Sequence, residues 1–118
     1  MSQENRLEKT NRINLLFDFY EQLLTEKQQT FLKHYFHEDF SLGEIASEFE
    51  ISRQAVYEHI KRAEQVLDTY EEKLGLLKKH EERLRELEKL RNMISDSALN
   101  DHDKKIMTDM VNQLIVWD

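Results

Sequence analysis

A segment of 27 residues, Ser41–Leu67, constrains the fold of this chain more than any other part of the sequence. Ser41 is followed three residues later by Glu44, which is the spacing of a capping box that begins a helix. Apolar residues then recur at helical spacing as far as Phe49, and the pattern breaks at Glu50. The segment therefore predicts a short helix that ends in a tight turn.

A second helix is predicted directly after this turn, with Ser52 as its N-cap. Its buried stripe is expected to consist of Val56, Ile60, Ala63 and Leu67. Two helices joined in this way predict a helix-turn-helix unit, whose second helix projects side chains toward a partner. The projecting side chains are Arg53, Gln54, Tyr57, Glu58 and Lys61. Glu50 stands where such turns often carry glycine, so a positive φ there would strain the backbone.

The rest of the chain is also predicted to be helical, because it has no proline and only two glycines. One helix is expected over about residues 6–24, and another begins with a capping box of Thr25 and Gln28 and runs to about His37. A last helix is expected to begin at Asn100. Its apolar stripe is formed by Ile106, Met110, Leu114 and Trp117. These patterns predict an all-α fold.

The second helix of the motif is predicted to continue well beyond the length that a recognition helix needs. Apolar residues continue at spacings that alternate between four and three, as in the seam of a coiled coil. The seam is formed by Leu67, Tyr70, Leu74, Leu77 and Leu84. We therefore predict a helix-turn-helix domain at 1–74, a helical extension at 75–118 that packs on the long helix or on a partner subunit, and a homodimer. Gly75 marks either a kink in the long helix or its end.

The charge of the chain argues against simple attraction to DNA. The net charge is −7, and residues 1–74 hold 9 Lys and Arg against 15 Asp and Glu. Because contacts to phosphates supply most of the non-specific affinity for nucleic acids, an acidic domain starts at a disadvantage. Arg53, Lys61 and Arg62 form at most a small basic patch, which Glu58 and Glu64 dilute. A protein partner is therefore as well supported by composition as a polyanion.

The sequence favours a cytoplasmic protein that is not an enzyme. It contains no cysteine, no apolar signal-peptide core and no apolar run of the roughly 20 residues that a membrane span needs. His34 and His37 are the only closely spaced histidines, and without further ligands of zinc-site spacing they do not predict a metal site. No glycine-rich phosphate loop or activated nucleophile is recognisable, so no cofactor and no catalytic residue are expected.

Residues 41–67 resemble region 4 of bacterial sigma factors, in the pattern SLGEIASEFEISRQAVYEHIKRAEQVL. Over a longer range, the segments KTNR, LLTEKQ, SLGEIA and SRQAVYEHIKR resemble the YlxM family of small helix-turn-helix proteins of Gram-positive bacteria. Members of that family are encoded beside the GTPase of the signal recognition particle. The resemblance thus implies an accessory or regulatory role in that pathway, with the particle GTPase or RNA as partner. It also implies a nucleic-acid surface at Ser52, Arg53, Gln54, Tyr57 and Lys61.

Three functions remain open at this stage. The first is the accessory role in the signal recognition particle pathway. The second is a DNA-binding transcriptional regulator, which would bind a two-fold site on duplex DNA with a steep dependence on salt. The third is a protein-interaction module that binds no nucleic acid. The acidic charge favours the first and the third over the second.

Overall fold

The computed structural model describes residues 3–117, with the side chains of residues 5–116. Most of the described residues are helical, with no strand among them, so the all-α prediction is confirmed. They form two compact units, which are divided between Gly75 and Leu76. The first unit holds α1 (Gln3–Tyr20), a 3-10 turn (Glu21–Leu23), α2 (Glu26–Leu32), a π-helical turn (Lys33–His37), α3 (Leu42–Phe49) and α4 (Arg53–Leu74). The second holds α5 (Leu76–Ser95) and α6 (Asp101–Trp117).

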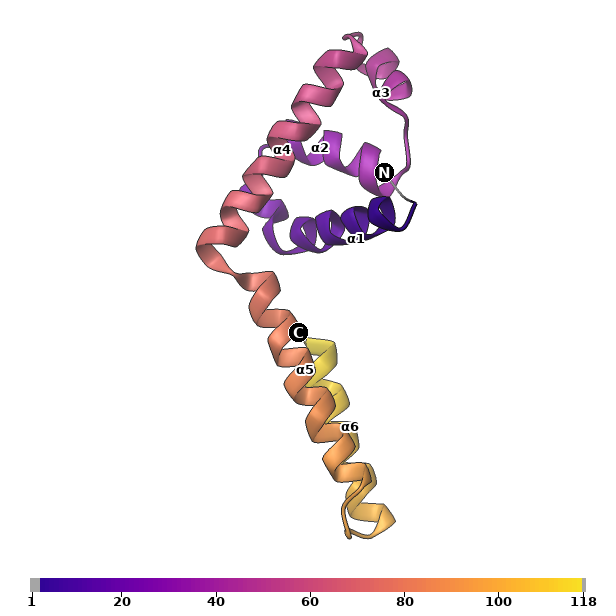
Figure 1. Ribbon diagram of the computed structural model, residues 1–118, viewed down its shortest axis with the longest axis vertical. Coiled ribbons are helices and arrows are strands. Elements are labelled where there is room, and N and C mark those ends of the chain that lie inside the picture. Colours follow the sequence, from indigo (N-terminus) through magenta and orange to yellow (C-terminus); the bar gives the residue numbers. More distant parts are fainter. Residues whose placement is uncertain (1–2, 118) are drawn as a thin grey trace. The chain divides into compact units, whose positions relative to one another are not determined.

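The core of the first unit forms around α4, against which α1, α2 and α3 all pack (Figure 1). The predicted stripe of α4 is buried at Val56, Ile60, Ala63 and Leu67. The other three helices cover it with buried apolar side chains, namely Ile13, Leu16, Phe17, Tyr20, Phe31, Leu32, Ile45 and Ala46. Burial of these side chains is the main stabilising contribution to the unit, and it leaves the opposite side of α4 exposed.

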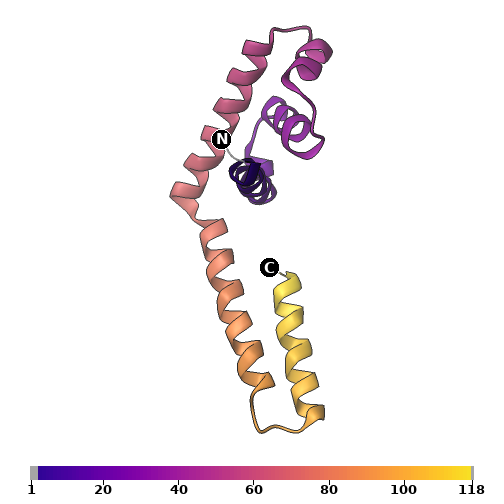
Figure 2. The ribbon, with the colours of Figure 1, turned by 45° about the vertical axis from the view of Figure 1, so that its right-hand side comes forward.

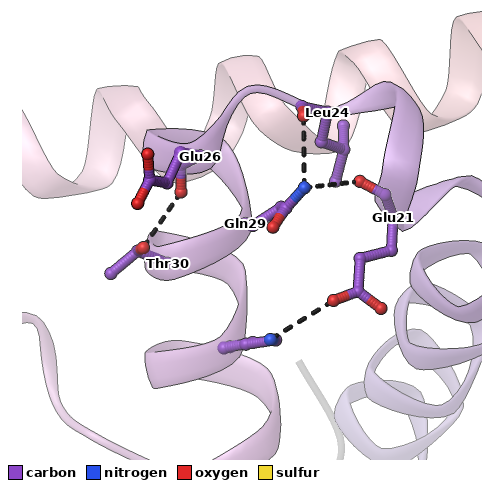
Figure 3. Close-up of polar contacts among 6 residues, drawn as sticks. Glu21, Leu24, Glu26, Gln29 and Thr30 are labelled. Carbon is purple, nitrogen blue, oxygen red and sulfur yellow. Dashed lines mark hydrogen bonds and ion pairs between the residues drawn. The ribbon is translucent and has the colours of Figure 1, made fainter.

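The junction between α1 and α2 is fixed by polar contacts to the backbone. The predicted capping box of Thr25 and Gln28 is present in both directions. The side-chain amide of Gln29 donates to the carbonyl oxygens of Glu21 and Leu24, at 2.8 and 3.2 Å (Figure 3). The first helix therefore ends as a 3-10 turn before Leu24, rather than running to Leu24 as predicted, because Leu24 takes an extended conformation that leads into the cap.

The helix-turn-helix itself follows the predicted pattern of caps. The Ser41–Glu44 capping box begins α3, and the hydroxyl of Ser52 accepts from the backbone N–H of Ala55 at 3.0 Å to begin α4. Between the two helices, Glu50 has φ 55° and ψ 43°, in the left-handed region. A side chain in this region is strained, and glycine is the residue that adopts it freely.

The strained turn leads to a prediction on stability. Replacing Glu50 with glycine is expected to raise the free energy of unfolding by about 0.5–1 kcal/mol, since the strain of the left-handed conformation is removed. Ser47→Gly, at an exposed helical position of α3, is the control and is expected to lower stability by roughly the same amount. Urea unfolding followed by circular dichroism measures both. A loss of stability in Glu50→Gly would show that the turn carries no such strain.

Gly75 ends α4, which settles the alternative that the sequence left open. It adopts φ 62° and ψ 30°, and its N–H donates to the carbonyl of Glu71 at 2.8 Å, as in a left-handed helix C-cap. Upstream, the predicted seam residues Leu67 and Tyr70 belong to the first unit. Leu67 is fully buried, whereas Tyr70 stacks on Tyr20 at 5.8 Å between ring centres.

The second unit is a hairpin in which α5 and α6 lie side by side (Figure 2). The amide oxygen of Asn100 accepts from the N–H of Asp103 at 2.8 Å, so the predicted cap of α6 is present. Arg91 of α5 donates to the Asn112 side chain of α6 at 3.0 Å. The buried apolar residues described in this unit are Leu77, Ile94 and Val111. Small apolar burial of this kind stabilises a hairpin only weakly.

The remaining predicted seam and stripe residues are less covered. Leu74 is 45% exposed at the end of α4, and Leu84 is half-buried on α5. On α6 the stripe of Ile106, Met110 and Leu114 is exposed, while the adjacent Val111 is buried. The side chain of Trp117 lies outside the described residues. The packing of α6 on α5 thus uses the edge of the predicted stripe and leaves its centre in contact with solvent.

Candidate nucleic-acid interface

The start of α4 places the first two predicted contact residues. Ser52 uses its hydroxyl as the helix cap, so its oxygen already has a donor within the chain. Arg53 lies across α3, where a Cβ built on Gly43 would be 3.1 Å from the Arg53 Nε and Nη2 atoms. The absence of a side chain at Gly43 therefore leaves room for the guanidinium group beside the α3 backbone.

The next turns of α4 carry the other predicted residues on its exposed side. The Gln54 amide donates to the Glu58 carboxylate at 3.4 Å. Tyr57 is 44% exposed, and the Lys61 ammonium lies 5.6 Å from the centre of its ring. A cation at this distance from an aromatic face is attracted by the ring. The aromatic ring and the charge thus form one small surface that could receive a partner.

The buried carboxylate of Glu64 forms an ion pair with Lys61. Glu64 has only 8% of its side chain exposed, and its two oxygens lie 3.4 Å from Lys61 Nζ and 3.2 Å from Lys9 Nζ. The negative charge of Glu64 and its hydrogen bond with the ammonium raise the pKa of Lys61 above its ordinary value. Lys61 therefore remains charged at neutral pH, but Glu64 offsets much of its positive potential.

The structure thus brings the predicted residues together on one helix and assigns several of them a partner within the chain. Further cations of the first unit are also paired, Arg12 with Asp68 at 3.6 Å and Lys33 with Glu21 at 3.2 Å. Arg53 forms no ion pair among the residues whose side chains are described. An exposed α4 that carries this arginine can bind a phosphate or a carboxylate, and its amide and phenol groups can donate hydrogen bonds.

Sequence reasoning missed the structural roles of Gly43 and Glu64. Glu64 directly follows Ala63 and lies four residues after Ile60, both in the buried stripe. Its burial could therefore have been predicted from the helical repeat. The pairing with Lys9 joins residues 55 positions apart, which no local pattern reports. Gly43 carried no sequence signal, because its role depends on how α3 crosses α4.

The two histidines considered for a metal site have other surroundings. His34 stacks on Phe40 at 5.1 Å, and its ring nitrogens lie 3.3 Å from Glu38 and 3.6 Å from Glu48. His37 meets the ring of Phe17 edge-on at 5.1 Å. No cluster of three or more potential ligands that could hold a metal occurs within the part of the chain that the structure describes. None of the described helices combines the length and hydropathy that crossing a bilayer requires.

Comparison with known proteins identifies the family. The model of the UPF0122 family, described as "Putative helix-turn-helix protein, YlxM / p13 like", matches residues 7–111 of the chain. The chain belongs to this family. The match covers α3, the turn and α4, and extends over both units of the structure. The resemblance to the YlxM family is therefore confirmed, and the family description names a helix-turn-helix and no catalytic activity.

Curated relatives of the UPF0122 family support the same assignment. A UPF0122 protein of Oceanobacillus iheyensis is 53% identical over 100 residues, which are 85% of this chain and 95% of the relative. One of Bacillus pumilus is 59% identical over 78% of this chain and 84% of the relative. One of Bacillus cereus is 50% identical over 92% of this chain and 98% of the relative. The relatives are thus matched over most of their length.

Proposed function

We propose that this UPF0122 protein is an accessory or regulatory protein of the signal recognition particle pathway, which binds nucleic acid through its helix-turn-helix. The observation that carries the proposal is the exposed side of α4, on which Arg53, Gln54, Tyr57 and Lys61 lie together at the second helix of the motif. The place in the pathway rests on the resemblance to the YlxM family. The proposal implies a cytoplasmic location, because the particle functions there.

The charge of the first unit favours the particle RNA or the particle GTPase over a DNA operator. Lys9 and Lys61 share Glu64, and Arg12 and Lys33 each face a carboxylate, so four of the nine cations in residues 1–74 are already paired, in a segment that holds 15 acidic residues. Affinity for duplex DNA depends on neutralising many phosphates at once. Binding of a folded RNA through a few phosphates and unpaired bases requires fewer cations, because stacking and hydrogen bonding contribute more of the affinity.

The test compares the intact protein with Arg53→Ala/Lys61→Ala on particle RNA, particle GTPase and duplex DNA over a series of salt concentrations. We expect the double variant to bind RNA at least about tenfold more weakly. The slope of log affinity against log salt should fall by roughly 1 for each phosphate that the variant no longer binds. Lys61→Ala alone should weaken RNA binding less than Arg53→Ala alone, because Lys61 already forms an ion pair with Glu64.

The control removes two exposed cations of the second unit, as Lys79→Ala/Lys105→Ala, with the same change in net charge. An equal loss of affinity in both double variants would mean that charge alone, and not the α4 surface, determines binding. Preference for a two-fold duplex DNA site would favour the transcriptional regulator. Binding to the GTPase with no nucleic-acid binding at low salt would favour the interaction module.

We also propose that the protein is a homodimer, and the second unit gives the strongest support. Besides its few buried residues, this unit exposes many large apolar side chains, namely Leu76, Leu90, Met93, Leu99, Ile106, Met107, Met110, Leu114 and Val116. A two-helix hairpin of 43 residues with this surface is too small to bury a sufficient core alone. A second copy of the same hairpin completes a four-helix bundle. Sedimentation at several protein concentrations should therefore show a dimer.

A further inference from the structure

A pocket of about 200 Å³ lies between the start of α2 and the exposed side of α4. From the α2 segment, Thr25, Lys27, Gln28 and Phe31 line it, and from α4, His59 and Arg62. None of these residues belongs to the predicted surface, which is formed by Ser52, Arg53, Gln54, Tyr57 and Lys61. The pocket therefore lies beside the candidate interface, on the flank of α4 that faces α2.

Aromatic packing holds the wall of this pocket in place. The rings of Phe31 and His59 are stacked, with 4.9 Å between their centres and an angle of 13° between their planes. Phe49 packs on Phe31 at the same distance, with an angle of 34° between the ring planes. Because Phe31 is only 1% exposed, the imidazole of His59 rests on a surface that cannot easily move. The position of His59 is thus set before any ligand binds.

Two cations at this pocket lack the carboxylate partners that four other cations of the unit have. Lys27 and Arg62 form no ion pair among the residues whose side chains are described, in contrast to Lys9, Arg12, Lys33 and Lys61. Arg62 donates only its Nε, to the carbonyl of Glu58 at 3.4 Å. In an acidic unit, such a convergence of two cations from different helices is the exception. Their nitrogen donors are available to an anion.

The imidazole of His59 lies within the positive field of these cations. Burial first, and then the charges of Lys27 and Arg62, lower the pKa of His59 below its ordinary value of 6.5, while Glu58 opposes them. His59 is therefore neutral at pH 7, and one ring nitrogen carries a hydrogen that can be donated. An anion between the three side chains would be held by two charges and a neutral donor.

We propose that Lys27, His59 and Arg62 form a binding site for a phosphate group of a nucleic-acid backbone. This inference rests on the proposed nucleic-acid function and extends its interface from α4 to α2. Arg62 follows Lys61 directly on the exposed side of α4, so a strand that crosses this helix can meet both the predicted surface and the pocket. Lys27 and Arg62 would bind the phosphate oxygens by charge-assisted hydrogen bonds, and His59 by a neutral one.

Binding of fluorescein-labelled oligouridylate and of particle RNA to the full chain tests the site. Lys27→Gln/Arg62→Gln is expected to weaken binding of both about tenfold or more and to lower the salt slope by roughly 1, because the site holds one phosphate group. Lys79→Gln/Lys105→Gln, with the same loss of charge in the second unit, is expected to leave both unchanged. If Arg53→Ala/Lys61→Ala weakens RNA binding and Lys27→Gln/Arg62→Gln does not, the pocket is refuted and the proposed function stands.

A second measurement is independent of RNA binding. Titration of the His59 imidazole by NMR, without and with inorganic phosphate, should show its pKa rising when phosphate is present, because a bound anion favours the charged imidazole. The rise should be absent in Lys27→Gln/Arg62→Gln. An unchanged pKa of His59 in the intact protein overturns the site, even if RNA binds elsewhere. A response of His59 to an oligoglutamate peptide but not to phosphate or RNA also overturns it, in favour of an acidic protein partner.

Discussion

Replacing Tyr20 with alanine is expected to lower the free energy of unfolding of the first unit by about 3–5 kcal/mol, as for other buried aromatic truncations. The side chain is fully buried, its ring stacks on Tyr70, and its hydroxyl donates to Glu71 Oε1 at 2.6 Å. Its removal creates a cavity between α1 and α4 and also removes a hydrogen bond to a carboxylate. For a domain of marginal stability, this loss is a large part of the total.

Urea unfolding monitored by circular dichroism measures the change, with Tyr57→Ala as the matched control. Tyr57 is 44% exposed, so its truncation should change stability by less than about 0.5 kcal/mol. Tyr20→Phe keeps the ring and loses only the hydroxyl, and it should fall between these two, at about 1–3 kcal/mol. Equal losses for Tyr20→Ala and Tyr57→Ala would contradict the buried position of Tyr20.

The second large effect is expected for Met110→Glu in the proposed homodimer. Met110 is 64% exposed near the middle of α6, within the apolar stripe of Ile106 and Leu114. A carboxylate that the dimer must bury without a partner disfavours association by several kcal/mol, so we expect dimerisation to weaken at least about 100-fold. Because the same position is exposed in a single chain, the helical content of the monomer should not change.

Lys105→Glu provides the control, because it adds a carboxylate to α6 about 140° around the helix from Met110. This variant should dimerise as the unchanged protein does, and Met110→Leu should also retain the dimer. Sedimentation equilibrium over a range of concentrations distinguishes these results. A monomer at every concentration in the unchanged protein would rule out the homodimer, and a dimer that tolerates Met110→Glu would place the contact on another face.

Local chemistry explains why much of the fold could be predicted from the sequence. Each cap is formed within four residues, so the capping boxes at Thr25 and Ser41 and the caps at Ser52 and Asn100 could be recognised from spacing alone. The buried stripe of α4 was predictable for the same reason, since it depends only on the helical repeat.

The partners of each apolar or charged face were not predictable, because they come from distant parts of the chain. The spacing of Leu67 and Tyr70 suits a seam between subunits as well as a contact within one. In the structure the ring of Tyr70 stacks on Tyr20 of α1, and its hydroxyl donates to the carbonyl of Leu23, in the 3-10 turn that follows α1, at 3.2 Å and 47 residues away. Likewise, Lys61 stands out in the sequence as a free cation, whereas Glu64 and Lys9 determine its surroundings.

The pairing of four cations in the first unit, which is acidic as a whole, has a consequence for competition inside a cell. Lys9, Arg12, Lys33 and Lys61 are already matched by carboxylates, so the unit attracts an arbitrary polyanion weakly. Bulk transcripts and chromosomal DNA, which are present in large excess, would then sequester little of the protein. A scarce RNA target can be found under these conditions only if its shape brings phosphates to the unpaired cations, such as Arg53. The low positive charge of the unit would thus reduce its affinity for nucleic acids other than its target.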